Sequence, residues 1–150
     1  MPDPNIPGAA ASTQIDHLGI AVRSIDQALK FYTGQLGLSV ALRETVPIEK
    51  VNVAMLPLGL PMSAASPDVP RIELLEAAEP GSVIARFIET RGEGLHHVAL
   101  RVPDLAGTVE RLRLAGARVL NEPREGAGGH IYVFVHPSST GGVLLELIQA

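Results

Sequence analysis

Ile15–Val22, with the sequence IDHLGIAV, reappears 80 positions later as Leu95–Val102, with the sequence LHHVALRV. Both stretches alternate apolar residues with polar or small ones, which is the pattern of a β-strand. Each is followed by a residue that can cap a helix and then by apolar residues at helical spacing. The chain therefore contains an internal duplication that places His17 and His97 at equivalent positions.

A helix is predicted after each copy of this strand. Ser24 can cap the first helix and Asp104 the second, and apolar residues then recur every three or four positions. The offset between the copies changes by one residue only near Gly37 and Gly116, each a typical residue at a helix C-terminus. The two apolar stripes consist of Ile25, Leu29, Tyr32 and Leu36, and of Leu105, Val109 and Leu112.

After each helix the pattern returns to the period of two that is typical of strands. Each half therefore reads as a βαβββ module, and a short linker helix is predicted over about 81–92. The predicted strands cover residues 15–22, 38–44, 51–58 and 70–76 in the first module and 95–102, 117–121, 131–136 and 143–148 in the second.

The expected domain organisation is a flexible tail followed by a single domain. Residues 1–14 are rich in Pro, Ala and Ser and lack the basic start and apolar run of a secretory signal. Residues 15–150 then form one domain, with module one at about 15–76 and module two at about 94–150. A long loop is expected at Leu60–Pro70 and a hairpin loop at Gly126–Gly129.

Each module ends in an apolar strand that carries one acid, Glu73 in the first and Glu146 in the second. A lone strand histidine is usually structural and a lone glutamate can point to solvent, but here both residue types recur. Burying a carboxylate without a partner costs free energy, so these acids need either solvent or a cation. The side chains of His17, Glu73, His97 and Glu146 together predict a site for one divalent ion. Two imidazoles and two carboxylates suit Mn, Fe, Co, Ni or Zn and do not select strongly among these metals.

The predicted fold class is therefore α+β, with two paired βαβββ modules forming a curved mixed β-sheet cup around a metal site. At 150 residues, of which 46% are hydrophobic, the chain is long enough for one well-buried core. Its net charge of −4 and aromatic content of 3% argue against nucleic acid as a partner. The absence of cysteine excludes disulfides and thiol catalysis, and the apolar runs are too short for a membrane helix.

The whole span Ile15–Ile148 resembles the vicinal oxygen chelate superfamily, which includes glyoxalase I, extradiol dioxygenases, bleomycin-resistance proteins and methylmalonyl-CoA epimerases. Paired βαβββ modules around a metal are its shared fold. Within it, Ser82–Phe87, Gly92–Ala99 and His136–Leu144 are similar to segments of the epimerase branch.

The resemblance implies that His17, His97 and Glu146 match the family's metal ligands, while Glu73 stands where epimerases carry Gln or Glu. His97 is selected over His96 because only His97 pairs with His17 across the repeat. His96 is expected to face the opposite side of the strand, in a structural role.

The implied reaction is metal-dependent epimerisation of methylmalonyl-CoA through an enediolate intermediate, with proton exchange on both faces of the substrate carbon. Glu146 is the first candidate acid/base. Glu49 is the candidate for the second, with Glu44 behind it, because an alignment through Val51–Leu56 places the family's second glutamate one residue before Glu49. The expected partner is an acyl-CoA substrate, and a cytoplasmic homodimer is expected.

Two alternatives remain open at the level of sequence. Glyoxalase I uses similar chemistry on a glutathione hemithioacetal, and its bacterial members can carry the same His, Glu, His, Glu set. A drug-binding protein of the bleomycin-resistance type is a lesser alternative, because it typically lacks the metal ligands. A ring-cleaving dioxygenase is disfavoured, since a fourth ligand at Glu73 would reduce its open coordination positions.

Overall fold

The computed structural model of the chain describes residues 13–59 and 69–150. Most of the predicted tail and of the predicted loop at Leu60–Pro70 therefore lies outside the described residues. Among the described residues, none of the helices has the length and apolar character needed to cross a membrane.

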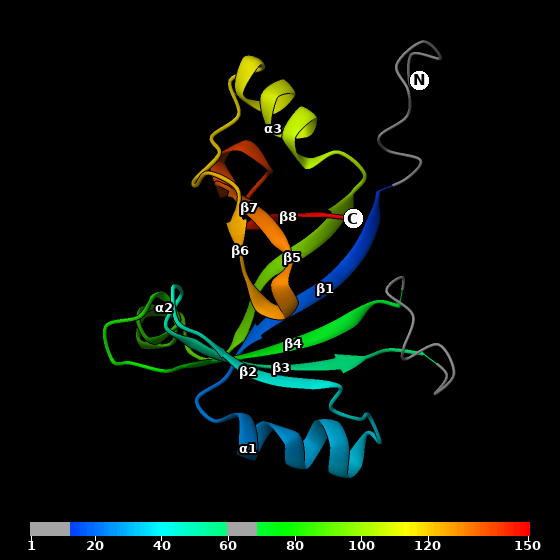
Figure 1. Cartoon of the computed structure of the whole chain (residues 1–150). Helices are drawn as coiled ribbons and strands as arrows, with labels where there is room; N and C mark the ends of the chain where they lie inside the picture. Colours follow the sequence, from blue (N-terminus) through cyan, green and yellow to red (C-terminus); the bar gives the residue numbers. More distant parts are fainter. Residues whose placement is uncertain (1–12, 60–68) are drawn as a thin grey trace. The chain divides into compact units, whose positions relative to one another are not determined.

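The described residues form eight strands in the order β2-β3-β4-β1-β5-β8-β7-β6, together with three α-helices (Figure 1). β1 pairs with β4 and β5 with β8 in parallel, whereas the pairs β2–β3, β3–β4, β6–β7 and β7–β8 are antiparallel. This mixed sheet confirms the predicted α+β class. The strands are β1 Gln14–Ala21, β2 Leu42–Val46, β3 Val51–Pro57, β4 Arg71–Ala77, β5 Gly94–Val102, β6 Arg124–Glu125, β7 Ile131–Val135 and β8 Leu145–Gln149, and the helices are α1 Ile25–Leu29, α2 Val83–Arg91 and α3 Leu105–Leu114.

The chain divides into two compact units. The first unit, His17–His97, contains most of β1, the strands β2 to β4, and helices α1 and α2. In it, Ile25 of α1 packs on Ala54, Leu56 and Leu74 of the sheet, all fully buried. The second unit contains Val98–Ala150 and the described residues that precede His17. Its core is formed by α3 on β7 and β8, with Val102, Leu105, Val109, Val133, Val135 and Leu147 buried.

Both units show the predicted helix signals. Ser24 accepts a hydrogen bond from Gln27 N and Asp104 from Gly107 N. Gly37 and Gly116 have φ values of 85° and 86°, which glycine adopts without the steric cost of a Cβ atom. The predicted helix boundaries are confirmed at these four positions.

The single-residue slip between the copies has a structural cause. In the first copy, α1 passes directly into a π-helical segment, η2 Lys30–Gln35, whereas α3 remains α-helical to Leu114. A π-turn closes five residues apart instead of four, as in the bond from Leu36 N to Phe31 O. The first copy therefore takes up its extra residue inside the helix, and both helices still end at a glycine.

The prediction of a strand at 117–121 was wrong. Val119 makes only an isolated bridge to Val135, and the short strand of this region is β6, Arg124–Glu125. The cause lies at Asn121, whose side-chain Oδ1 accepts the hydrogen bond from Phe134 N. A side chain thus occupies a place that a backbone carbonyl would fill in a regular ladder. Similarly, β2 begins at Leu42, later than predicted.

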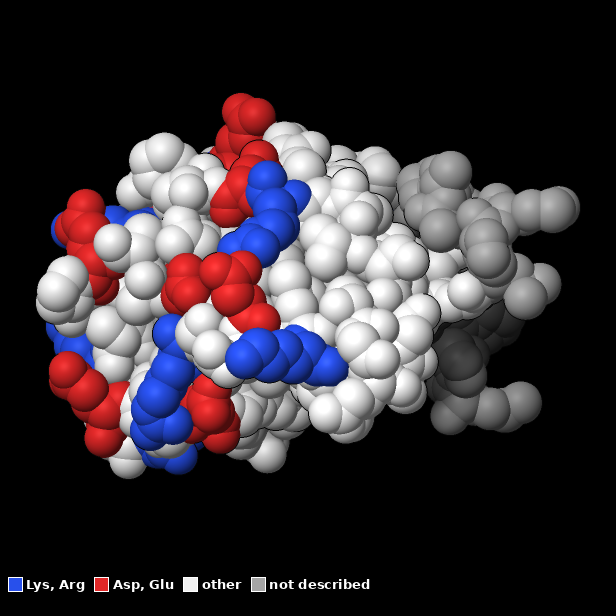
Figure 2. Space-filling view, turned by 90° about the horizontal axis from the view of Figure 1, so that it is seen from below, with Lys and Arg blue, Asp and Glu red and all other residues white. Residues whose placement is uncertain are grey.

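Figure 2 shows charged side chains of both signs interspersed over the left part of one face, whereas the described surface to the right of them is uncharged. In the first unit, exposed ion pairs join Arg43 to Asp26 at 2.8 Å and Lys50 to Glu79 at 3.6 Å. Exposed pairs of this kind contribute little to stability. Their effect is to balance charge locally.

The two copies share a helix-capping contact that was not visible in the sequence pattern. Glu76 Oε1 accepts a hydrogen bond from Ile25 N at 3.0 Å, and Gln149 Oε1 accepts one from Leu105 N at 2.9 Å. In each copy, the residue three positions after the strand glutamate satisfies the first N–H group of the helix. Helix N-termini leave such donors without partners inside the helix, so the last strand of each module fixes the start of its helix.

We expect Glu76→Ala and Gln149→Ala each to lower the free energy of unfolding by about 1 kcal/mol, as for the loss of a helix-capping acceptor. Glu76→Gln is the matched control, since a glutamine already performs this task in the second copy. Urea denaturation at constant slope measures the change. An unchanged midpoint for both alanine variants would contradict the capping role.

Candidate metal centre

The first unit brings together His17 of β1, Glu73 of β4 and His97 of β5. The two imidazole Nε2 atoms lie 3.0 Å apart, and Glu73 Oε1 lies 3.5 Å from each of them. The residues are 1%, 5% and 4% exposed. A carboxylate buried to this extent requires hydrogen bonds or a nearby positive charge.

These three donor atoms fit one metal ion. The point equidistant from them lies about 1.9 Å from each atom, given their separations. Zinc bonds to nitrogen and carboxylate oxygen are roughly 2.0–2.2 Å long. The three atoms are therefore spaced so that His17, Glu73 and His97 could together hold one ion of this size. Two imidazoles and a carboxylate are also donors that first-row divalent metals accept.

Gly19 makes room for this arrangement. A Cβ atom added at Gly19 would lie 2.2 Å from Cε1 of His97 and 2.6 Å from its Nε2. Any other residue at this position would displace the His97 ring. The sequence contains a signal for this requirement, since the equivalent position in the second copy is Ala99, but its meaning depends on the position of the ring.

Glu146 belongs to the second unit and lies on β8. Glu146 is 8% exposed. In the sheet register it is paired with Ala99 of β5 on one side and with Phe134 of β7 on the other. The first unit has the same register, in which Glu73 is paired with Gly19 and Met55. Each glutamate thus lies opposite the residue two positions after its histidine. The duplication is retained in the register as well as in the sequence.

The two candidates for a second acid/base occupy different places in the first unit. Glu44 is on β2 and is aligned with Val53 and, through it, with Leu75. Its neighbour Thr45 bonds to Asn52, which bonds to Glu76 on the α1 side of the sheet.

Because strand side chains alternate, Glu44 lies on the other face, which it shares with Glu73. Glu49 lies instead in the turn between β2 and β3. Of the two glutamates, Glu44 is therefore the one that the register places on the sheet face of the metal candidates.

His96 differs from its predicted place. Its Nδ1 atom lies 2.9 Å from Nδ1 of His97, and its ring contacts Phe87 of α2 edge-to-face, with centroids 4.9 Å apart. It is therefore in direct contact with a candidate ligand rather than separated from it by the strand. Strand alternation directs the side chains of His96 and His97 to opposite faces of β5. Their Nδ1 atoms are nevertheless close enough to the backbone to lie within hydrogen-bond distance of each other. His136, by contrast, caps the 3₁₀ segment η4, Pro137–Ser139, because its Nδ1 atom accepts a hydrogen bond from Ser138 N at 3.0 Å.

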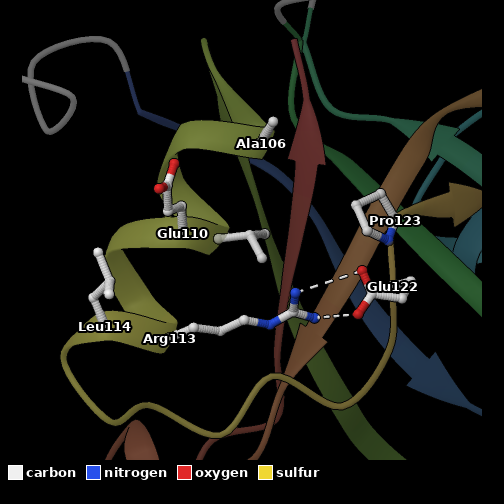
Figure 3. A pocket seen from close by; sticks show the side chains of 7 residues that line it. Ala106, Glu110, Arg113, Leu114, Glu122 and Pro123 are labelled. Carbon is white, nitrogen blue, oxygen red and sulfur yellow. Dashed lines mark hydrogen bonds and ion pairs between the residues drawn. The ribbon is translucent and has the colours of Figure 1, made fainter.

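A separate groove lies in the second unit, between α3 and the segment that contains Glu122 and Pro123 (Figure 3). Its volume is about 340 Å³, and Arg113 bridges it through an ion pair to Glu122 at 2.8 Å. No histidine lines it, and its two acids, Glu110 and Glu122, lie on exposed positions. This groove offers no metal-binding set.

Residues 16–134 match the model of the Glyoxalase/Bleomycin resistance protein/Dioxygenase superfamily. The ethylmalonyl-CoA/methylmalonyl-CoA epimerase of Cereibacter sphaeroides is 36% identical over 139 residues, covering 91% of this chain and 97% of the relative.

Two solved structures are similar over almost the whole chain. A variant of the Streptomyces coelicolor methylmalonyl-CoA epimerase, in complex with 2-nitronate-propionyl-CoA, has a TM-score of 0.84 at 33% identity and covers 91% of this chain and 96% of its own. A methylmalonyl-CoA epimerase in complex with methylmalonyl-CoA and NH4+ also has a TM-score of 0.84 at 33% identity, covering 92% and 94%. The family model matches most of the chain and similar epimerases match over 91% of it, so the chain belongs to the glyoxalase/bleomycin resistance protein/dioxygenase superfamily.

Proposed function

We propose that this protein is a metal-dependent methylmalonyl-CoA epimerase whose divalent ion is held by His17, Glu73, His97 and Glu146. The observation that carries the proposal is the compact, buried triangle of two Nε2 atoms and one carboxylate oxygen in the first unit. Similarity to epimerases over 91% of the chain supports the choice of reaction.

Glu146 is proposed as the fourth ligand on the basis of the duplication. It repeats the register of Glu73, it is buried, and with His17 and His97 it offers a donor type that metals accept. Two neutral imidazoles and two carboxylates carry a charge of −2, which a divalent ion neutralises. The ion would thereby offset the cost of burying both acids.

A divalent ion bound there would supply Lewis acidity, which favours loss of the proton beside the thioester carbonyl. The protein's own task is to remove that proton from one face of the carbon and return one to the other. We assign one of these tasks to Glu146.

For the other task, we favour Glu44 over Glu49. Glu44 shares the sheet face of Glu73 and lies two strands and two residues away, which corresponds to about 12 Å between Cα atoms. This spacing leaves room for a substrate carbon between the ligand cluster and the base. Glu49, in the turn, is the alternative.

The same proposal includes the partners and the setting. An acyl-CoA thioester is the substrate, the protein is a homodimer, and it acts in the cytoplasm. The acyl-CoA ligands of the similar solved structures support the substrate class.

The reaction is tested by incubating the purified protein with methylmalonyl-CoA in heavy water. We expect deuterium to enter at C2, to stop entering after treatment with a chelator, and to enter again when a divalent ion is restored. Turnover of a glutathione hemithioacetal without any exchange at C2, under every metal tried, would instead identify a glyoxalase.

The second acid/base is tested by comparing Glu44→Gln with Glu49→Gln. Loss of a positioned acid/base costs roughly 10²- to 10⁴-fold in rate. We expect Glu44→Gln to lower the rate of epimerisation by that factor. One epimer should still exchange its C2 proton, because Glu146 acts on the opposite face of the substrate carbon and remains intact. The reverse pattern, with Glu49→Gln inactive and Glu44→Gln active, would assign the role to Glu49.

The shape of the metal site is tested at Gly19. We expect Gly19→Ala to weaken Zn²⁺ binding at least 10-fold, because the added methyl group displaces the His97 ring. Gly34→Ala is the matched control, since a Cβ atom there meets only Leu29 O, at 4.0 Å. Isothermal titration of the metal-free proteins measures both affinities. Equal affinities for the Gly19→Ala variant and the wild type would show that His97 is not a ligand in this position.

A further inference from the structure

The two ring nitrogens of His97 have different surroundings. Nε2 faces the candidate metal centre, 3.0 Å from Nε2 of His17 and 3.5 Å from Oε1 of Glu73. Nδ1 lies on the other side of the ring, 2.9 Å from Nδ1 of His96. A neutral imidazole carries its proton on only one nitrogen, so the hydrogen bond at Nδ1 decides whether the Nε2 lone pair is free to bind a metal.

We propose that His96 is a positioning residue for the metal centre, a role that rests on the proposed metal-dependent function. Its Nδ1 accepts a hydrogen bond from Nδ1–H of His97, and this bond holds His97 in the tautomer whose Nε2 lone pair points at the ion. Histidine ligands usually donate their second N–H group to a carboxylate, a carbonyl or water. In this chain the acceptor is the imidazole of the preceding residue.

The His96 ring is held in place by the linker helix. Phe87 of α2 contacts it edge-to-face, with an interplanar angle of 82°, and the guanidinium carbon of Arg91 lies 5.8 Å from the centroid of Phe87. The rings of His96 and His97 are nearly perpendicular, at 88°. His97 is thus confined between His96 on one side and the bare backbone of Gly19 on the other. Helix α2 therefore contributes to the metal centre without supplying a ligand.

The duplication does not require this arrangement. In the first copy the residue before the histidine is Asp16, which is 1% exposed and lies 3.4 Å from Nε of Arg101 in the second unit. The position before the histidine is therefore occupied by the proposed acceptor His96 in the second copy and by the ion-paired Asp16 in the first copy. The His96 contact is specific to the second histidine.

Zn²⁺ affinity of the whole chain, measured by isothermal titration, tests the role. His96→Phe keeps an aromatic ring against Phe87 but removes the acceptor, and we expect it to weaken Zn²⁺ binding 10- to 100-fold, as is typical for such partners. His96→Asn places an amide oxygen near the position of Nδ1 and is expected to restore affinity to within about 5-fold of wild type. His130→Phe, the same substitution at a histidine of the second unit, is the control and should bind like wild type.

The protonation pattern of the wild-type protein gives a second readout, which does not depend on how the variants fold. In long-range ¹H–¹⁵N spectra of the Zn²⁺-loaded protein, we expect His97 to be protonated at Nδ1 and His96 to be unprotonated there.

Unchanged affinity in His96→Phe, or a proton on Nδ1 of His96, would overturn the positioning role and leave the metal-dependent function standing. A wild-type protein that binds no divalent ion would overturn the metal-dependent function itself, and the positioning role with it.

Discussion

The burial of one carboxylate between two imidazoles is the constraint on which the rest of the site depends. Glu73 is almost inaccessible to solvent, and both of its imidazole neighbours are buried as well. Such a group is stable only while its partners remain in place, because an unpaired buried charge is strongly destabilising. Strands β1, β4 and β5 therefore hold the side chains of His17, Glu73 and His97 close together. The missing side chain of Gly19 is part of that requirement.

Duplication explains how such a site is assembled from little sequence information. Each copy contributes a histidine, and a glutamate in the same register two residues further along the paired strand. The copies differ at an equivalent position of the neighbouring strands, β2 and β6. Glu44 is aligned with Val53 in the first unit, and Arg124 with Tyr132 at the equivalent place in the second. The repeat thus supplies an acid in one copy and a cation, whose Nε donates to the Tyr132 hydroxyl, in the other.

The linker between the copies is more than a connection. Phe87 of this helix contacts His96, which in turn contacts His97, so the helix is connected to a candidate ligand through two successive contacts. A similar division of tasks links the strands to the helices, since Glu76 and Gln149 fix the helix starts from the strands that carry the acids. The same short strands therefore set the geometry of both the core and the site.

The sequence alone determined the βαβββ repeat, the α+β class, the helix caps at Ser24 and Asp104, and the pairing of His17 with His97. These features follow from local periodicity and from a constant offset, both of which can be read along the chain. The prediction of a strand at 117–121 was wrong because the side-chain oxygen of Asn121, and not a backbone carbonyl, accepts the hydrogen bond from Phe134 N. The residue pattern along the chain does not show such a replacement.

Only the tertiary structure decided the distances of the histidine–glutamate triangle, the need for glycine at position 19, and the face occupied by Glu44. It also decided that His96 touches His97 rather than facing away. The physical reason is that each of these features depends on where side chains from different strands meet. That depends on register, packing and ring orientation, which are properties of the folded chain and not of any single segment.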